Sequence, residues 1–111
     1  MNDCLFCKII AGEMPSKIEY QDEEVIVFHD INPKAPVHLL ILPKEHLKNI
    51  NDFSEKEGSL GDKLFLTAKK MAKKMNVDKS GYRLVINNGL DAGQEINHLH
   101  IHLLGGKRQE F

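Results

Sequence analysis

Residues 97–104 read Asn-His-Leu-His-Ile-His-Leu-Leu, with three histidines at alternate positions. Such alternation predicts a β-strand, because successive side chains of a strand point to opposite faces of its sheet. One face would carry His98, His100 and His102, with neighbours about 6–7 Å apart, and the other would bury the intervening leucine and isoleucine. Imidazoles titrate near neutral pH, and several of them could meet on one small anion. The alternative is a half-buried strand with solvated histidines.

The bulk composition bounds the fold and the classes of partner. A chain of 111 residues suits a single domain, 1–111, and 41% hydrophobic with 28% charged residues is ordinary for a globular protein. The formal net charge is −1 and no basic tail is present, which argues against a nucleic-acid partner. No apolar run approaches the roughly 18 residues of a membrane span, and the N-terminus lacks an apolar signal segment. We expect a cytoplasmic protein without a membrane partner.

Outside the histidine run, four segments have the character of β-strands: 17–20, 25–29, 37–42 and 82–87. Segment 37–42 is apolar almost throughout and is therefore expected at the centre of the sheet. Prolines and an asparagine make 30–36 a loop, and a second loop over 88–94 leads to the histidines. Short connections without βαβ alternation favour an antiparallel five-stranded sheet in an α+β fold.

Two helices complete the expected fold. A short one over 4–11 is closed by Gly12. A long one begins at Ser54, which forms a capping box with Glu57. Its buried face follows the spacing of a helix and comprises Leu60, Leu64, Ala68, Met71, Ala72 and Met75. The lysines of this helix fall largely outside that face and are interpreted as a solvated surface.

Cys4 and Cys7 form a CxxC motif near the N-terminus. In a cytosolic chain this spacing indicates either a redox pair or half of a metal site. A redox pair usually follows a strand of a βαβ unit, and none is expected before Cys4. Half a metal site is favoured, provided that two further ligands come from elsewhere in the chain.

The histidine run fits the pattern His-x-His-x-His-x-x and resembles the histidine triad (HIT) superfamily, specifically its Hint branch. Further blocks carry the resemblance in the family's order, at 6–10, 28–33, 35–38, 42–46, 87–89, 93–94 and 103–106. The resemblance implies a HIT-like fold and a homodimer. It also implies hydrolysis of the P–N bond of purine nucleoside 5′-phosphoramidates, of the AMP-amine or AMP-lysine type, through a covalent nucleotidyl-histidine intermediate.

The resemblance also implies the roles of individual residues. His100 would be the nucleophile, since a neutral imidazole can attack phosphorus without first losing a proton. His102 would bind the phosphate oxygens, His98 would be a scaffold, and His38 would support the histidine strand from behind. The nucleotide-binding positions would be Leu5, Phe6, Ile9, Phe28, His29, Asp30, Asn87, Gly93, Gln94 and Glu95.

Within that set the apolar side chains would sandwich the base, and Asp30 would accept hydrogen bonds from the ribose. Gly93 would allow close approach of the phosphate, and Asn87 and Gln94 would offer side-chain amides. Without the resemblance, the apolar set reads as plain core, Gly93 as a turn residue and Asn87 as the cap of a strand end. Glu95 departs from the family pattern, which often has serine there. Its carboxylate must point away, be protonated, or contact a cationic leaving group.

In relatives with the CxxC motif, zinc is held by four side chains. The resemblance therefore implies a structural zinc site at Cys4, Cys7, His46 and His98, because two thiolates and two imidazoles make a closed tetrahedral set. The alternative is a pair of reduced thiols beside an ordinary surface histidine.

Three other functions stay open. A dinucleoside polyphosphate hydrolase is disfavoured by the Leu-Leu-Gly-Gly ending at 103–106 and by the short chain. A nucleotide-binding partner protein with vestigial activity would not need a nucleophile at His100. A metal enzyme with all three triad histidines on one ion is disfavoured because alternate strand positions splay the ligands too widely.

Overall fold

The structure is a computed structural model that describes residues 3–110. Its centre is an antiparallel sheet with the strand order β1-β2-β3-β5-β4. The strands are β1 (Ile18–Gln21), β2 (Val25–His29), β3 (Val37–Pro43), β4 (Tyr82–Val85) and β5 (Ile101–Gly105). The predicted α+β fold is confirmed, including the central place of the third strand.

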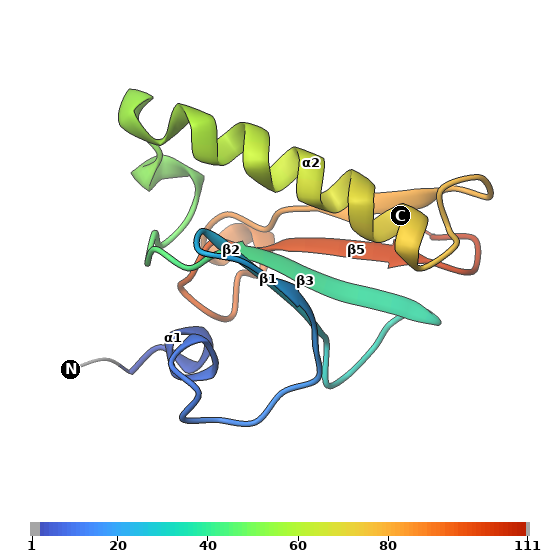
Figure 1. Ribbon diagram of the computed structural model, residues 1–111, viewed down its shortest axis with the longest axis horizontal. Coiled ribbons are helices and arrows are strands. Elements are labelled where there is room, and N and C mark those ends of the chain that lie inside the picture. The colour runs from blue at the N-terminus through green and yellow to red at the C-terminus, as the bar shows by residue number, and fades with distance from the viewer. Residues whose placement is uncertain (1–2, 111) are drawn as a thin grey trace.

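The long helix α2 (Gly58–Lys74) lies along one face of the sheet (Figure 1). It begins later than predicted, because the capping box starts a 3₁₀ turn, η2 (Glu55–Glu57), in which the Ser54 main-chain N–H donates to the Glu57 carboxylate at 2.7 Å. Of the predicted buried face, Met75 lies just beyond the helix and is partly buried, and Thr67 was missed. The helix packs on a core that includes Val25, Leu39, Ile41, Leu99, Ile101 and Leu103.

Two lysines of α2 tie the helix to the β1–β2 hairpin. Lys63 Nζ lies 2.9 Å from Asp22, and Lys74 Nζ lies 2.9 Å from Glu19. Both side chains remain partly exposed, at 35% for Lys63 and 49% for Lys74, so they form ion pairs at a solvated surface. They extend from the edge of the buried stripe and reach carboxylates at the rim of the sheet.

The short helix α1 (Leu5–Ile10) lies on the opposite side of the sheet from α2 (Figure 1). Its N-cap is Cys4, whose Sγ accepts a hydrogen bond from the main-chain N–H of Cys7 at 3.3 Å. A second core fills the space between α1 and the sheet, built from Phe6, Ile9, Ile26, Phe28, Leu40 and Leu42. The sheet is thus buried on both faces at β2 and β3.

The histidine run differs in part from a single long strand. β5 begins only at Ile101, so His98 and His100 precede it. On the neighbouring strand, β3 ends at Pro43, and the carbonyl of Pro43 accepts a hydrogen bond from the His98 side chain at 2.8 Å. This carbonyl is therefore occupied by a side chain and not by the main chain of the histidine run. The alternation still holds across this break, because the apolar residues between the histidines enter the core under α2.

Other boundaries shift slightly. β1 is displaced by one residue from the predicted strand, and β4 ends at Val85, two residues early. Two 3₁₀ turns that the sequence pattern did not reveal are η1 (Ile50–Asp52) and η3 (Leu90–Ala92). Within residues 3–110, no helix combines the length and apolarity needed to cross a membrane.

Candidate active site

A pocket of about 640 Å³ opens on the α1 side of the sheet, and we call it the histidine pocket. Its walls come from α1 and the loop after it, β2 and the loop after it, β3, the end of β4, the segment before β5, and β5 itself. A volume of this size is typical of small-molecule sites. All ten predicted nucleotide-binding residues line it, together with His38, His100 and His102. His98 is fully buried and does not line it.

Ten further residues that were not predicted from the sequence line the pocket: Met14, Pro15, Ser16, Ile31, Asn32, Lys34, Leu40, Val85, Ile96 and Leu104. Two of them carried a usable signal. Leu40 follows His38 by two positions on β3, and Leu104 follows His102 by two positions on β5. Because residues two apart on a strand share a face, both could have been placed beside the histidines.

His100 is held in one tautomer by the main chain. Its Nδ1 lies 2.6 Å from the carbonyl oxygen of His98, which can only accept, so Nδ1 carries the hydrogen and Nε2 carries the lone pair. The ring is 8% exposed, and Phe6 packs against it edge-on with ring centres 5.0 Å apart. Burial lowers the pKa of His100, so the imidazole is neutral at neutral pH. The solvated-histidine reading is therefore wrong.

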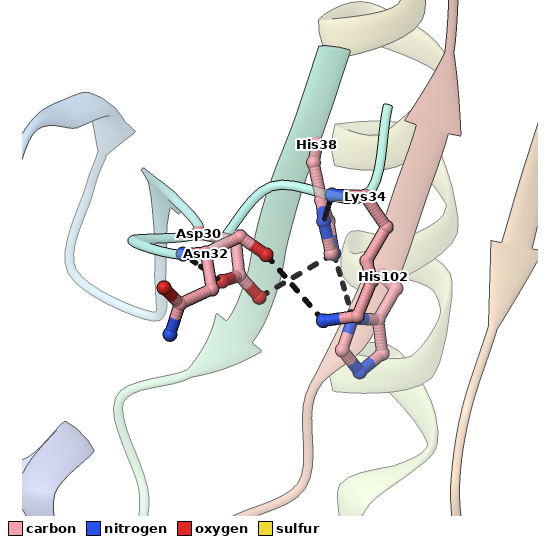
Figure 2. Close-up of polar contacts among 5 residues, drawn as sticks. All are labelled: Asp30, Asn32, Lys34, His38 and His102. Atoms are coloured by element: carbon pink, nitrogen blue, oxygen red, sulfur yellow. Dashed lines mark hydrogen bonds and ion pairs between the residues drawn. The ribbon is translucent and has the colours of Figure 1, made fainter. Parts of the chain in front are cut away.

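Two successive hydrogen bonds also fix the tautomers of His38 and His102 (Figure 2). The main-chain N–H of Lys34 donates to His38 Nδ1 at 3.0 Å, so the hydrogen of His38 sits on Nε2. That nitrogen donates to His102 Nδ1 at 3.0 Å. The remaining hydrogen of a neutral His102 is then on Nε2. The pocket therefore holds one imidazole with a free lone pair and, next to it, one with a free N–H.

The charges around this pair favour neutral rings. Burial, followed by the nearby His100 and His38, lowers the pKa of His102 to about 4. Burial also lowers the pKa of His38, although the Asp30 carboxylate acts in the opposite direction. The two rings therefore hydrogen-bond to each other without carrying a charge at neutral pH.

Asp30 has partners within its own loop. Its Oδ1 accepts a hydrogen bond from the main-chain N–H of Asn32 at 2.8 Å, and its Oδ2 lies 3.4 Å from His38 Nε2 (Figure 2). The carboxylate thus shapes the β2–β3 loop and faces the His38–His102 pair.

The loop before β5 is braced by Gln94. Both hydrogens of its side-chain amide go to main-chain carbonyls, that of Lys48 at 2.7 Å and that of Ile96 at 3.1 Å. Its oxygen accepts from the main-chain N–H of Gly89 at 2.8 Å. This side chain therefore holds the loop in shape instead of donating into the pocket, which differs from the expectation. Gly93 has a φ of +83°, a left-handed conformation that favours glycine.

Asn87 and Glu95 line the pocket from the same side. Glu95 is exposed, and none of the hydrogen bonds or ion pairs found among residues 3–110 involves its carboxylate. The Glu95 carboxylate is thus available at the exposed side of the pocket.

The CxxC motif meets two histidines beside the pocket. The ligand atoms of Cys4, Cys7, His46 and His98 all lie within 4.8 Å of one another. His98 Nδ1 is 3.4 Å from Cys4 Sγ and 3.5 Å from Cys7 Sγ, and His46 Nδ1 is 3.2 Å from Cys7 Sγ. The His98 hydrogen is on Nε2, which donates to Pro43, so Nδ1 offers its lone pair to the cluster. The four side chains could hold a metal ion.

The chain resembles known proteins along almost its whole length. Residues 11–109 match the HIT domain family model. The chain is 44% identical over 106 residues to the purine nucleoside phosphoramidase of Escherichia coli (strain K12), a match that covers 95% of this chain and 88% of that protein. A protein of Buchnera aphidicola (subsp. Baizongia pistaciae), described only as an uncharacterized HIT-like protein, is 51% identical over 105 residues, with 94% and 93% covered.

Solved structures agree with the sequence matches. The crystal structure of a HIT family hydrolase from Legionella pneumophila Philadelphia 1 has a TM-score of 0.95 and 43% identity, covering 98% of this chain and 97% of that one. A HIT family hydrolase from Clostridium thermocellum has the same TM-score and 46% identity, covering 99% and 96%. With its histidine run, its pocket and these matches together, the chain belongs to the HIT domain family.

Proposed function

We propose that this protein is a nucleotide hydrolase that cleaves the P–N bond of purine nucleoside 5′-phosphoramidates through a nucleotidyl-histidine intermediate. The observation that carries the proposal is the 2.6 Å hydrogen bond from His100 Nδ1 to the His98 carbonyl, which leaves the Nε2 lone pair on a pocket-lining ring. The name of the 44% identical E. coli relative, a purine nucleoside phosphoramidase, supports this substrate class.

In the first step His100 Nε2 attacks the α-phosphorus. A P–N bond to the imidazole forms while the P–N bond to the amine breaks, and its electron pair stays on the amine nitrogen. The amine takes up a proton from pocket water as it leaves, because an amide anion is a very poor leaving group. In the second step the hydroxide that this water leaves behind attacks phosphorus, the bond to His100 breaks with its electron pair returning to Nε2, and the nucleoside monophosphate is released with His100 neutral again.

Catalysis of this kind depends on placement and on stabilising charge at the phosphate oxygens. The Nε2–H of His102 is the donor next to the nucleophile, and its direction is set by the chain from Lys34 N–H through His38. An uncharged nucleophile also avoids the desolvation of an anion in a buried site. With their tautomers fixed, His100 would act as the nucleophile and His102 as the hydrogen-bond donor to the phosphate.

The apolar wall supports a nucleoside-binding role for the rest of the pocket. Phe6 and Phe28 form an edge-to-face pair with ring centres 5.4 Å apart, and both are core residues with one side on the pocket. Such rigid aromatic walls bury a flat base with little loss of side-chain entropy. Asp30 lines the same pocket, where its carboxylate would accept hydrogen bonds from the ribose hydroxyls.

The arrangement of Cys4, Cys7, His46 and His98 fits a zinc ion. Zinc bonds of about 2.3 Å to sulfur and 2.0–2.1 Å to nitrogen in a tetrahedron place sulfur and nitrogen about 3.6 Å apart. Three of the four sulfur–nitrogen separations are 3.2–3.5 Å, and all four ligand atoms lie within 4.8 Å of one another. Cys4, Cys7, His46 and His98 would fill all four positions, so the ion would be structural and would tie α1 to the segment before β5.

A homodimer is part of the proposal. Phe65 and Leu66 on α2 are 67% and 62% exposed, and β4 is an edge strand on which Leu84 is 40% exposed. Exposed apolar side chains and an edge strand are both features that suit contact with a second copy of the chain. Sedimentation equilibrium would test it: replacing Phe65 with Glu should shift a dimer toward monomer, whereas a monomeric wild-type protein would contradict it.

The reaction is tested by supplying adenosine 5′-phosphoramidate and a diadenosine polyphosphate to the wild type and to His100→Ala. We expect turnover of the phosphoramidate in preference to the polyphosphate, and a loss of at least about 10³-fold in His100→Ala. Retained AMP binding by the variant shows that its pocket is folded. Preference for the polyphosphate would favour that hydrolase instead, and binding without turnover would indicate a partner protein. Full activity in His100→Ala would refute the covalent route.

A further inference from the structure

Lys34 is the one lysine or arginine among the lining residues of the histidine pocket. It lies in the loop between β2 and β3, a region without the periodic patterns from which the sequence analysis worked. The other formally charged lining residues are Asp30 and Glu95, both acidic. The cation of this pocket therefore comes from a position that no motif identified.

The main chain and the side chain of Lys34 do different things. The main-chain N–H donates to His38 Nδ1 at 3.0 Å and thereby sets the tautomers of His38 and His102. The side chain lines the same pocket as His38 and His102, and its terminal nitrogen points to the Asn32 carbonyl (Figure 2). In agreement with this position, the Lys34 charge is among the influences that lower the pKa of His102, after burial and the neighbouring histidines. The ammonium thus belongs to the same pocket as the N–H donor of His102, and its charge acts on that ring.

The ammonium has little to bind within the chain. Its contact is the main-chain carbonyl of Asn32, at 3.4 Å (Figure 2). Asp30 is nearby, but its oxygens face the Asn32 N–H and the His38 ring, and no ion pair involving Lys34 is found among residues 3–110. A cation that faces a pocket without a carboxylate partner is available to an anion.

We propose that the Lys34 ammonium binds a non-bridging oxygen of the substrate phosphate, in addition to the Nε2–H donor of His102. The proposal rests on the proposed function and adds a residue to it. Negative charge on these oxygens persists through the transfer, and two neutral imidazoles cannot balance it. Lys34 supplies that balance from the loop that also orients His38, so one segment sets both the geometry and the charge of the phosphate site.

The test uses Lys34→Gln, which removes the charge and keeps the main-chain N–H on which His38 depends. Lys69→Gln is the matched control, because Lys69 is an exposed lysine on α2, which packs on the other face of the sheet. Binding of AMP and of adenosine is measured by calorimetry at low and high salt. Turnover of adenosine 5′-phosphoramidate is measured in parallel.

Lys34→Gln should weaken AMP binding and lower kcat/KM by about tenfold, as expected for a lost charged hydrogen bond, with adenosine binding unchanged. Its AMP affinity should also depend less on salt, Lys34→Arg should retain most of the affinity, and Lys69→Gln should match the wild type. Unchanged AMP affinity in Lys34→Gln, or an equal loss for adenosine, would overturn the inference and leave the proposed hydrolase intact. A wild-type protein that binds neither AMP nor the phosphoramidate would remove both.

Discussion

Replacing Gly106 with alanine tests how the loop that carries the phosphate-site residues is held. Gly106 has a φ of +92°, and a β-carbon added there would lie 2.9 Å from Cβ and 3.2 Å from Cγ of Pro36. A left-handed alanine costs about 1–2 kcal/mol, and crowding in a packed site costs about 1–3 kcal/mol more. The sum is a loss of about 2–5 kcal/mol. Pro36 lies between Lys34 and His38, so relief of the overlap would also displace the loop.

Gly12 separates the two costs. Its φ is +82°, but an added β-carbon there meets no atom within 4 Å. Gly12→Ala should therefore lose only the conformational part, about 1–2 kcal/mol. At about 4 °C per kcal/mol for a chain of this size, Gly106→Ala should melt about 4–12 °C below Gly12→Ala. Urea and thermal unfolding followed by circular dichroism measure both variants. Equal losses would refute the reasoning, because Pro36 would then not pack on Gly106.

Three further predictions concern the metal cluster, the pocket rim and the pH dependence of stability. Protein purified without added metal should contain about one zinc ion per chain by elemental analysis. Cys7→Ser should lose this zinc and unfold at a lower temperature. A zinc content near zero in the wild-type protein would contradict the site. If the Glu95 carboxylate contacts a cationic leaving group, Glu95→Ser should lower the ratio of kcat/KM for cationic over anionic leaving amines by about three- to fivefold. An unaltered ratio would exclude a contact between Glu95 and the leaving group. Burial disfavours ionisation of Asp22, but hydrogen bonds from Lys63, the main chain and Tyr20 outweigh it and hold the pKa of the carboxyl well below its usual range. Because the pKa of Asp22 is lower in the folded protein than in the unfolded chain, where it is near 3.8, the ionised carboxylate stabilises the fold at pH values above about 3.8. This stabilisation is lost as the pH falls below that value. The free energy of unfolding should therefore drop more between pH 5 and pH 3 in the wild type than in Asp22→Asn, and parallel pH curves from urea titrations would count against this ion pair.

The sequence predicts most of the sheet because its signals are local. The apolar stretch 37–42 corresponds to the central strand β3, and the alternation at 98–104 places the histidines and the intervening apolar residues on opposite sides. The ends of elements are less predictable, since they depend on neighbours. β5 starts at Ile101 because the carbonyl of Pro43, distant in sequence, binds the His98 ring.

The site shows the same division. Most residues that line the pocket from α1, β2 and the loop before β5 were identified through motifs shared with a family, with Ile96 an exception. Lys34 and the bracing role of Gln94 were not, because both depend on the path of an irregular loop and on which carbonyls come within reach. The tautomers of His100 and His102 have no sequence signal either, since single main-chain groups set them.

The central claim is that the neutral His100 ring becomes bonded to phosphorus during turnover. The most direct measurement mixes excess enzyme with an adenosine phosphoramidate, quenches within a single turnover under mildly alkaline conditions, and locates the adduct by peptide mass spectrometry. We predict an acid-labile AMP group on His100 that forms and decays at rates sufficient for turnover. Turnover without any adduct on His100, or with the adduct on another residue, would contradict the account.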